Sequence, residues 1–213
     1  MQSDRFNVSL SLFLRFCLPK EKGGNNMKNN KLTLRALTEG AIFVAAAQVL
    51  SMIKLFELPQ GGSISLAMLP IFVYCARWGL GAGLMAGFSF GAVHMIFSGA
   101  YAWGWQSIIG DYLAAYTALG LAGLFHKQEK GFFTGAVVGS FARFLVHYLV
   151  GVWVWGEYMP EEFFGMTMTT PWFYSLLYNG SYMLIDAILC LLVGLLLWKY
   201  MGGYLRGEDI RKA

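Results

Sequence analysis

Three otherwise apolar stretches of the chain carry polar side chains whose types could bind a ligand. The first stretch has an aspartate followed by two tyrosines, and the third is rich in tyrosine. The second has four residues spaced four apart, which places them along one face of a helix. In sequence order, these residues are Asp111, Tyr112 and Tyr116, then Arg143, His147, Gly151 and Trp155, then Tyr174, Tyr178, Asn179, Tyr182 and Asp186.

The chemistry that these groups offer is non-covalent recognition. Asp111 can hold a cation, while His147 and Asn179 can each donate and accept hydrogen bonds. Trp155 and the tyrosines offer flat faces for an aromatic ring or a delocalised cation. Gly151 lies one turn from both His147 and Trp155, so it is expected to leave a ring-sized gap between them. The set predicts a small, planar, polar and cationic ligand.

The composition places these residues in a membrane protein. Of the 213 residues, 57% are hydrophobic and 13% are charged, whereas soluble domains carry about 25% charged residues. This balance excludes an ordinary cytosolic enzyme, a disordered chain and a secreted disulfide scaffold. The net charge of +4 does not indicate nucleic-acid binding, because the basic residues lie at segment ends. Cys17, Cys75 and Cys190 are far apart and predict neither a disulfide framework nor a zinc site.

The hydrophobic pattern predicts an all-α membrane protein with six transmembrane helices in a compact bundle, at roughly 20 residues per span. The expected spans are about residues 34–53, 61–76, 80–98, 107–125, 131–155 and 171–198. Residues 1–26 contain an apolar stretch that is too short to span and is followed by no cleavage site. We interpret residues 1–26 as an N-terminal extension, with a weak interfacial helix as the alternative, and residues 27–213 as a single membrane domain.

Two sequence features predict how the helices are oriented and packed. Basic residues gather at both ends of the chain and in the turns after the second and fourth spans, whereas Lys54 is the only basic residue of the opposite loops. The positive-inside rule therefore places both termini in the cytoplasm. Glycines spaced four apart are expected to let helix backbones approach closely; they are Gly83, Gly87 and Gly91, and Gly131, Gly135 and Gly139.

This topology brings the polar residues of three spans to one depth. Asp111 lies about one turn in from the outer end of the fourth span. His147 and Trp155 lie in the outer half of the fifth, and Tyr174 and Asn179 lie in the outer half of the sixth. Because polar groups are costly inside a bilayer, they are expected to face a shared cavity near the external surface. An interfacial aromatic belt is the better explanation for any one of four outer aromatic residues taken alone; they are Trp153, Trp155, Tyr158 and Trp172. The deeper Arg143 and Asp186 are interpreted as a structural ion pair.

Five segments in this order resemble the thiamine-specific substrate-binding (S) components of energy-coupling factor (ECF) transporters. The segments are LPQGGSISLAMLPIF (58–72), RWGLGAGL (77–84), DYLAAYTALGLAGLF (111–125), HYLVGVWVW (147–155) and WFYSLLYNGSY (172–182). The resemblance runs from about Leu34 to Tyr200. It implies a bacterial, multi-pass protein of the cell membrane that is not an enzyme and captures thiamine at the extracellular side.

The resemblance also implies partners and site residues. The partners are the lipid bilayer, a transmembrane coupling subunit and two cytoplasmic ATPase subunits; thiamine is the transported ligand, and no cofactor or metal is implied. The ligand-binding residues map onto Asp111, Tyr112, His147, Gly151, Trp155, Tyr174 and Asn179. Trp155 and His147 would contact the rings, Tyr174 and Asn179 the aminopyrimidine edge, and Asp111 the amino group or the thiazolium charge. Ala41 and Ala45 fit the small-residue pattern that docks the coupling subunit.

Two departures from the family pattern and three other functions remain open. Some relatives have Glu where this chain has Asp111, and some have a Trp in the first external loop, which residues 54–66 lack. The ligand could be another vitamin or a thiamine precursor. Arg143, His147 and Asp186 could form the proton relay of a self-sufficient transporter. A membrane enzyme using Asp111 and His147 as acid and base is the third alternative, but no motif for nucleotide hydrolysis, metalloproteolysis or serine catalysis accompanies them.

Overall fold

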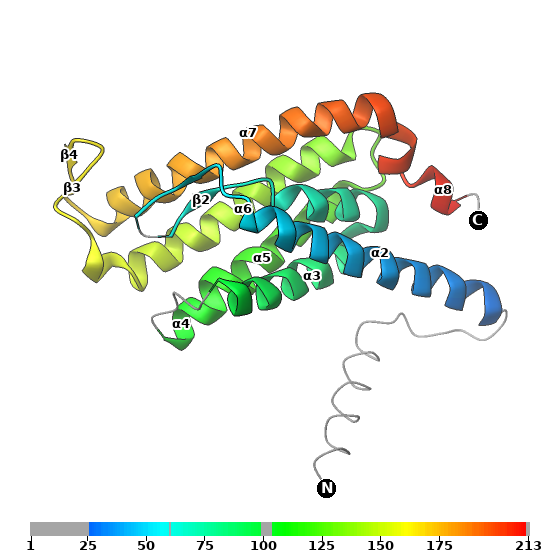
Figure 1. Cartoon of the computed structure of the whole chain (residues 1–213), viewed down its shortest axis with the longest axis horizontal. Helices are drawn as coiled ribbons and strands as arrows, with labels where there is room; N and C mark the ends of the chain where they lie inside the picture. Colours follow the sequence, from blue (N-terminus) through cyan, green and yellow to red (C-terminus); the bar gives the residue numbers. More distant parts are fainter. Residues whose placement is uncertain (1–25, 60, 99–103, 212–213) are drawn as a thin grey trace, which may run out of the picture. The chain divides into compact units, whose positions relative to one another are not determined.

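Helices make up most of residues 26–59, 61–98 and 104–211, the part of the chain that the computed structural model describes (Figure 1). The four long helices are α2 (Asn26–Met52), α3 (Met68–Phe97), α6 (Gly131–Trp153) and α7 (Pro171–Leu205). Between α3 and α6 the helical winding changes along α4 (Trp105–Ser107), the π-helix η1 (Ile108–Ala114), α5 (Ala115–Ala118) and the 3₁₀-helix η2 (Leu119–Phe125). The short helices η3 (Gly156–Tyr158) and α8 (Glu208–Arg211) follow α6 and α7.

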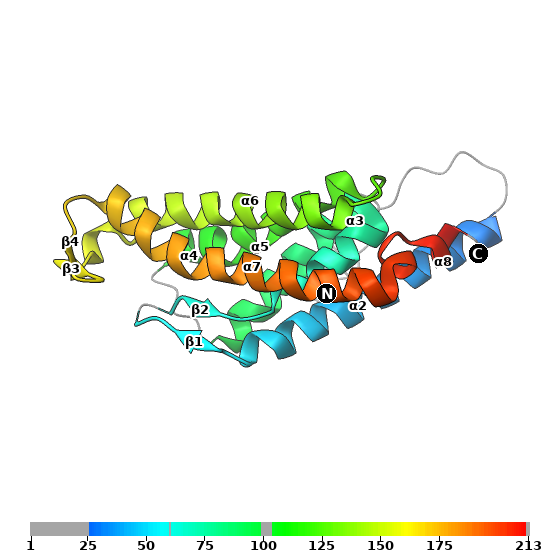
Figure 2. The same ribbon diagram turned by 90° about the horizontal axis from the view of Figure 1, so that it is seen from above.

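Two small antiparallel hairpins connect these helices. The first pairs β1 (Phe56–Glu57) with β2 (Ser63–Ile64), and the second pairs β3 (Glu162–Phe163) with β4 (Met166–Thr167). α6 and α7 run side by side in both views and are joined at one end by β3 and β4; we call this the hairpin end (Figures 1 and 2). The chain divides between Arg35 and Ala36 into two compact units, and the contacts and the cavity described below belong to the second unit. The expected N-terminal extension, residues 1–26, lies outside the described residues except for Asn26.

Five helical segments of the described residues are long and apolar enough to cross a membrane. They are Leu34–Met52, Met68–Phe97, Trp105–Phe125, Gly131–Trp153 and Pro171–Ile210. The expected all-α membrane protein is therefore confirmed. The count of six spans and the cytoplasmic location of both termini stay predictions.

The structure differs from the sequence-based expectation at the second span, residues 61–76. Residues 61–67 belong to the first hairpin and its exit, and the helix begins only at Met68. It is then interrupted at Gly79, whose φ of 81° lies in the left-handed region that favours glycine. Residues 68–78 are about 16 Å long at 1.5 Å per residue, roughly half of a bilayer core. The apolar composition of residues 61–76 thus covers a hairpin followed by a half-length helix.

The hairpin backbone is hydrogen-bonded to α7, which explains how a non-helical segment is tolerated here. Gly62 N–H donates to the Tyr178 hydroxyl at 2.8 Å, and Ser65 N–H donates to the Asp186 carboxylate at 2.8 Å. Within a membrane, irregular backbone is stable only where protein groups or a polar cavity satisfy its amides. Tyr178 and Asp186 supply such partners.

The glycine-rich faces of α3 and α6 pack directly against backbone, as the sequence predicted. A Cβ added at Gly87 would fall on the Tyr116 carbonyl oxygen, and one added at Gly91 would fall on the Tyr112 carbonyl oxygen. On α6, a Cβ at Gly135 would meet the Ala122 carbonyl oxygen. Such backbone contact maximises dispersion attraction, which must replace the hydrophobic effect between helices in lipid.

At the end opposite the hairpin end, a buried arginine joins three parts of the second unit. The Arg77 guanidinium donates to both carboxylate oxygens of Glu39 on α2, each at 3.0 Å, and to those of Asp209 on α8 at 3.0 and 3.1 Å. Its carbon atom lies 3.4 Å from the centre of the Tyr204 ring. The bidentate geometry fixes the relative positions of these elements.

The backbone contact at Gly87 predicts a loss of stability for Gly87→Ala. The added methyl group would overlap the Tyr116 carbonyl oxygen, so the two helices must move apart. This displacement is expected to lower the free energy of unfolding by about 1–3 kcal/mol. Gly81→Ala, in the same helix, is the matched control, because nothing lies within 4 Å of its added Cβ. Thermal unfolding of the detergent-purified variants checks this, and equal unfolding temperatures for the two would contradict the packing.

Candidate ligand-binding site

A cavity of about 460 Å³ lies toward the hairpin end of the bundle. Its walls come from α2, the first hairpin, α3, η1, α6 and α7. All seven residues expected to bind a ligand line it: Asp111, Tyr112, His147, Gly151, Trp155, Tyr174 and Asn179. The structure thus brings together residues up to 68 positions apart in the sequence (179 − 111).

The Asp111 carboxylate is the hydrogen-bonding centre of this cavity. His147 Nδ1 lies 3.0 Å from one carboxylate oxygen; the Trp155 indole N–H and the Ser107 hydroxyl donate to the other at 2.9 and 2.8 Å. Since a carboxylate accepts, His147 donates its Nδ1–H to Asp111, and in the neutral ring Nε2 is then an acceptor. Nε2 is buried and has no partner among the described residues. The arrangement therefore presents a negative charge and an imidazole acceptor to a ligand.

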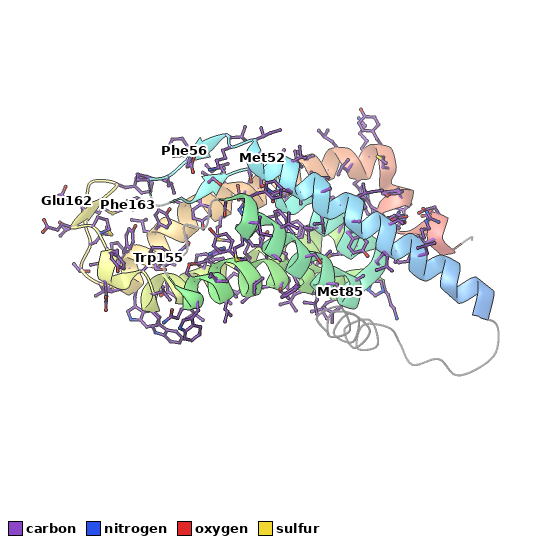
Figure 3. All side chains as sticks on the ribbon, turned by 60° about the horizontal axis from the view of Figure 1, so that its bottom comes forward. Met52, Phe56, Met85, Trp155, Glu162 and Phe163 are labelled. Atoms are coloured by element: carbon purple, nitrogen blue, oxygen red, sulfur yellow. The ribbon has the colours of Figure 1, made fainter. Side chains whose placement is uncertain are left out.

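Trp155 belongs to the cavity, whereas its neighbour Trp153 does not. The Trp155 side chain is half-buried, lines the cavity and donates to Asp111. Trp153 is 74% exposed, as expected of a residue in an interfacial aromatic belt. Trp155 also lies at the hairpin end, the end that carries Glu162 and Phe163 (Figure 3). The sequence left open whether such tryptophans line the cavity or form an interfacial belt. By position, Trp155 lines the cavity and Trp153 fits the belt.

The groups that surround Gly151 and Asn179 differ from those that the sequence predicts. A Cβ at Gly151 would collide with the Ser175 hydroxyl of α7. The glycine therefore allows α7 to pack closely against α6, whereas the sequence predicted only a ring-sized gap here. The Asn179 amide nitrogen donates to the Ser175 carbonyl and hydroxyl, each at 3.1 Å, and its oxygen accepts from the Tyr182 hydroxyl at 3.0 Å. The amide is thereby held in a fixed orientation at the cavity wall.

Tyrosines one turn apart on α7 support both hairpins. The ring centres of Tyr174 and Tyr178 are 5.6 Å apart, and those of Tyr178 and Tyr182 are 5.7 Å apart. Leu58 of the first hairpin and Met168, which follows the second, pack into the same cluster. Tyr174 thus lines the cavity and also contributes to the surface on which the hairpins rest.

Sequence reasoning missed several residues of the cavity. The first hairpin contributes Glu57, Gly61, Gly62 and Ser63 to its walls, but residues 61–76 were read as a span. The adjacent glycines and alternating serines in GGSIS are the signal that could have indicated a turn. His94 on α3 also lines the cavity, and nothing in its sequence spacing connects it with the other polar residues.

The expected structural ion pair between Arg143 and Asp186 is not found. No ion pair within 4.0 Å joins them in the described part of the chain, although both line the cavity. Asp186 accepts from Ser65 N–H instead, and Arg143 donates to the Tyr116 hydroxyl at 3.2 Å and lies over that ring. The first hairpin, which the sequence did not predict, supplies the amide that Asp186 binds.

Comparison with known proteins gives concordant results. The family model described as "Thiamine transporter protein (Thia_YuaJ)" matches residues 37–203. The thiamine transporter ThiT of Bacillus subtilis (strain 168) is 34% identical over 185 residues, which cover 80% of this chain and 93% of the relative. ThiT of Lacticaseibacillus paracasei is 31% identical over 179 residues, which cover 75% and 85%.

A solved structure is similar over nearly its whole length. The structure of ThiT from Listeria monocytogenes matches with a TM-score of 0.72 and 28% sequence identity, covering 81% of this chain and 98% of that one. The matched family region includes every residue of the cavity described above. A membrane-helical fold, a polar cavity and a family match over residues 37–203 together establish that the chain belongs to the thiamine transporter family.

Proposed function

We propose that this chain is the high-affinity thiamine-binding subunit of an ATP-driven ECF transporter in the cell membrane of a bacterium. It captures thiamine at the extracellular side and has no enzymatic activity of its own. The observation that carries the proposal is the half-buried Asp111 carboxylate, which lines a polar and aromatic cavity in a member of the thiamine transporter family. A planar organic cation with hydrogen-bonding edges matches that cavity.

The chemistry of thiamine matches the groups in the cavity one by one. Its thiazolium ring carries a permanent positive charge, for which the Asp111 carboxylate is the neutralising partner. Its aminopyrimidine offers an amino donor, for which the free Nε2 of His147 is an acceptor. The indole of Trp155 and the phenol of Tyr174 offer faces for the two rings. Tyr112, Gly151 and Asn179 complete the proposed binding set.

The proposed side of entry follows from the charge of the loops. The hairpin end carries Glu157, Glu161 and Glu162 and no basic residue between Trp153 and Pro171, which indicates the outside of the membrane. The cavity lies toward this end. Thiamine would therefore enter from the medium without crossing the bilayer core.

The energy for transport is proposed to come from partner subunits. The sequence contains no phosphate-binding GxxxxGK[ST] motif. Ala41 and Ala45 of α2 are both exposed, one turn apart, and are flanked by the exposed Ile42 and Val49. Small residues on an open apolar face let a second helix approach closely in lipid. We assign this face to the transmembrane coupling subunit, which connects the chain with two cytoplasmic ATPases.

Titration of the purified protein with thiamine tests the binding function. Calorimetry is expected to show saturable binding at submicromolar thiamine without partner subunits. Trp155→Ala is expected to weaken binding by about 1–3 kcal/mol, the size of base–aromatic stacking losses. Trp153→Ala is the matched control, because Trp153 is exposed and outside the cavity, and should change the affinity by less than about 0.5 kcal/mol. Equal affinities for the two variants would remove Trp155 from the site.

The outcome for other ligands separates the alternative functions. Hydroxymethylpyrimidine binding as tightly as thiamine would point to a precursor as the true ligand. Uptake by vesicles that contain this chain alone, abolished when the proton gradient is collapsed, would instead favour a proton-coupled transporter that uses Arg143, His147 and Asp186.

Asp111→Asn is predicted to discriminate between charged and neutral ligands. It keeps a similar shape but removes the negative charge, so thiamine affinity should fall about tenfold or more. An analogue with a neutral thiophene in place of the thiazolium should lose less. Glu157→Gln is the control, since it removes an exposed carboxylate outside the cavity at the same end. Equal losses for both ligands in Asp111→Asn would contradict a charge role.

Bulky residues at the proposed docking face should separate binding from transport. Ala41→Trp and Ala45→Trp are expected to reduce thiamine uptake by the assembled transporter to a small fraction, because a bulky side chain prevents close helix approach. Thiamine binding by the isolated chain should stay unchanged. Ser89→Trp, at an exposed small residue of α3, is the control. Normal uptake by the α2 variants would refute the docking role.

A further inference from the structure

The second hairpin lies next to the cavity but outside its walls. Phe163 ends β3, and the two residues Phe164 and Gly165 connect β3 to β4. Phe163 is found at the hairpin end, as is Trp155 of the cavity (Figure 3). Within the described part of the chain, none of the three hairpin residues is among those that line the cavity. Any influence of this hairpin on a ligand must therefore pass through the cavity wall.

Phe163 packs against two tyrosines of α7 that belong to this wall. Its ring meets the Tyr174 ring edge-on, at an angle of 88° and with the ring centres 5.6 Å apart. The centre of the Tyr178 ring lies 5.7 Å from that of Phe163 and 5.6 Å from that of Tyr174. Edge-to-face contacts between aromatic rings have a preferred geometry. Phe163 thus restricts the orientation of two rings that line the cavity.

Tyr174 and Tyr178 differ in how their side chains are held. The Tyr178 hydroxyl accepts from Gly62 N–H at 2.8 Å and so has a polar partner in the first hairpin. Tyr174 is 5% exposed, but no hydrogen bond holds its hydroxyl within the described residues. Ring contacts therefore orient Tyr174, and Phe163 supplies the one that comes from outside α7.

The tip of the hairpin has an unusual residue in its turn. Both connecting residues have positive φ, 52° at Phe164 and 71° at Gly165. Turns of this kind favour Asn-Gly, and a bulky side chain at the first position is strained. Phe164 is 60% exposed, and its ring centre lies only 4.2 Å from that of Phe163. The residue that the turn disfavours is thus the one that covers Phe163, and such strain is often found at functional sites.

We infer that Phe163 is a positioning residue for the ligand cavity, which holds the Tyr174 ring in its binding orientation and is itself covered by Phe164. The inference rests on the proposed thiamine-binding function and extends its control to a hairpin that does not touch the ligand. Without Phe163, the Tyr174 ring would have to be ordered during binding. Ordering a side chain on binding lowers the affinity.

Calorimetric titration of the full-length, detergent-purified chain with thiamine tests this role. Phe163→Leu is expected to weaken thiamine binding about threefold to tenfold, the cost of ordering one side chain. Phe173→Leu is the matched control, because Phe173 precedes Tyr174 in the chain but is 39% exposed and does not line the cavity. Its affinity should stay within about twofold of the wild-type value.

A double-mutant cycle shows whether Phe163 acts through Tyr174. Phe163→Leu is introduced into a chain that already carries Tyr174→Leu, and thiamine affinity is measured again. Because the ring to be held is then missing, the second change should alter the affinity by less than about twofold. The same loss in the presence and absence of the Tyr174 ring would overturn the inference.

Phe164→Asn separates positioning from stability. Asparagine tolerates positive φ, so thermal unfolding should occur at the wild-type temperature or above it. The ring that covers Phe163 is lost, however, so thiamine binding should weaken by about twofold or more. Wild-type affinity in this variant would overturn the role of Phe164 and reduce the tip to a structural turn.

The outcomes distinguish this inference from the proposed function. A wild-type chain that binds thiamine, together with a Phe163→Leu variant of equal affinity, overturns the positioning role and leaves the thiamine site intact. A wild-type chain that binds no thiamine overturns the proposed function and the positioning role together.

Discussion

The structure depends on the high cost of burying polar groups in a chain that lipid surrounds. The Asp111 carboxylate illustrates this most directly, because it gathers Ser107, His147 and Trp155 from two segments of the chain. Without these partners, a carboxylate between apolar helices would be strongly unfavourable. The same contacts that make the charge tolerable hold it in a fixed orientation at the cavity wall. The same hydrogen bonds to Asp111 therefore contribute both to stability and to ligand recognition.

Irregular backbone follows the same constraint. The first hairpin, the π-helix η1 and the break at Gly79 are departures from regular α-helix within or beside the long helices. The hairpin and η1 both contribute to the cavity wall. In a membrane protein, non-helical backbone is tolerated where it lines a polar cavity or is covered by protein. Their position beside Asp111 and Asp186 therefore has a physical reason.

Much of the site could be predicted from the sequence, because span order and direction alone determine depth. The order of the spans predicts one depth for Asp111, His147 and Trp155, and in the structure His147 and Trp155 are both hydrogen-bonded to Asp111. Glycine spacing likewise predicted close helix packing. These conclusions need only the helical period and the alternation of span direction.

Other features could not be predicted, because they depend on contacts between segments that are distant in sequence. The GGSIS sequence indicates a turn, but it does not show what holds residues 61–67 in place. The hydrogen bonds from their backbone amides to Tyr178 and Asp186 explain why they form a hairpin and its exit. The same contacts explain the mistaken ion pair: Asp186 bonds the Ser65 amide instead of Arg143. Hydropathy and spacing contain no information on which of two possible partners a buried carboxylate takes.

The contact between α3 and the helical segment that carries Tyr112 and Tyr116 also limits which substitutions this chain can accept. At Gly87 and Gly91, the atoms that would obstruct a side chain are the carbonyl oxygens of Tyr116 and Tyr112. Every amino acid has that oxygen, so no substitution at the facing position can make room. A larger residue at either glycine cannot be rescued by a second mutation across this contact, unlike a misfit between two side chains. Sequence drift is therefore blocked here by the partner's backbone, whereas Gly81, whose added Cβ would meet nothing within 4 Å, is free to vary.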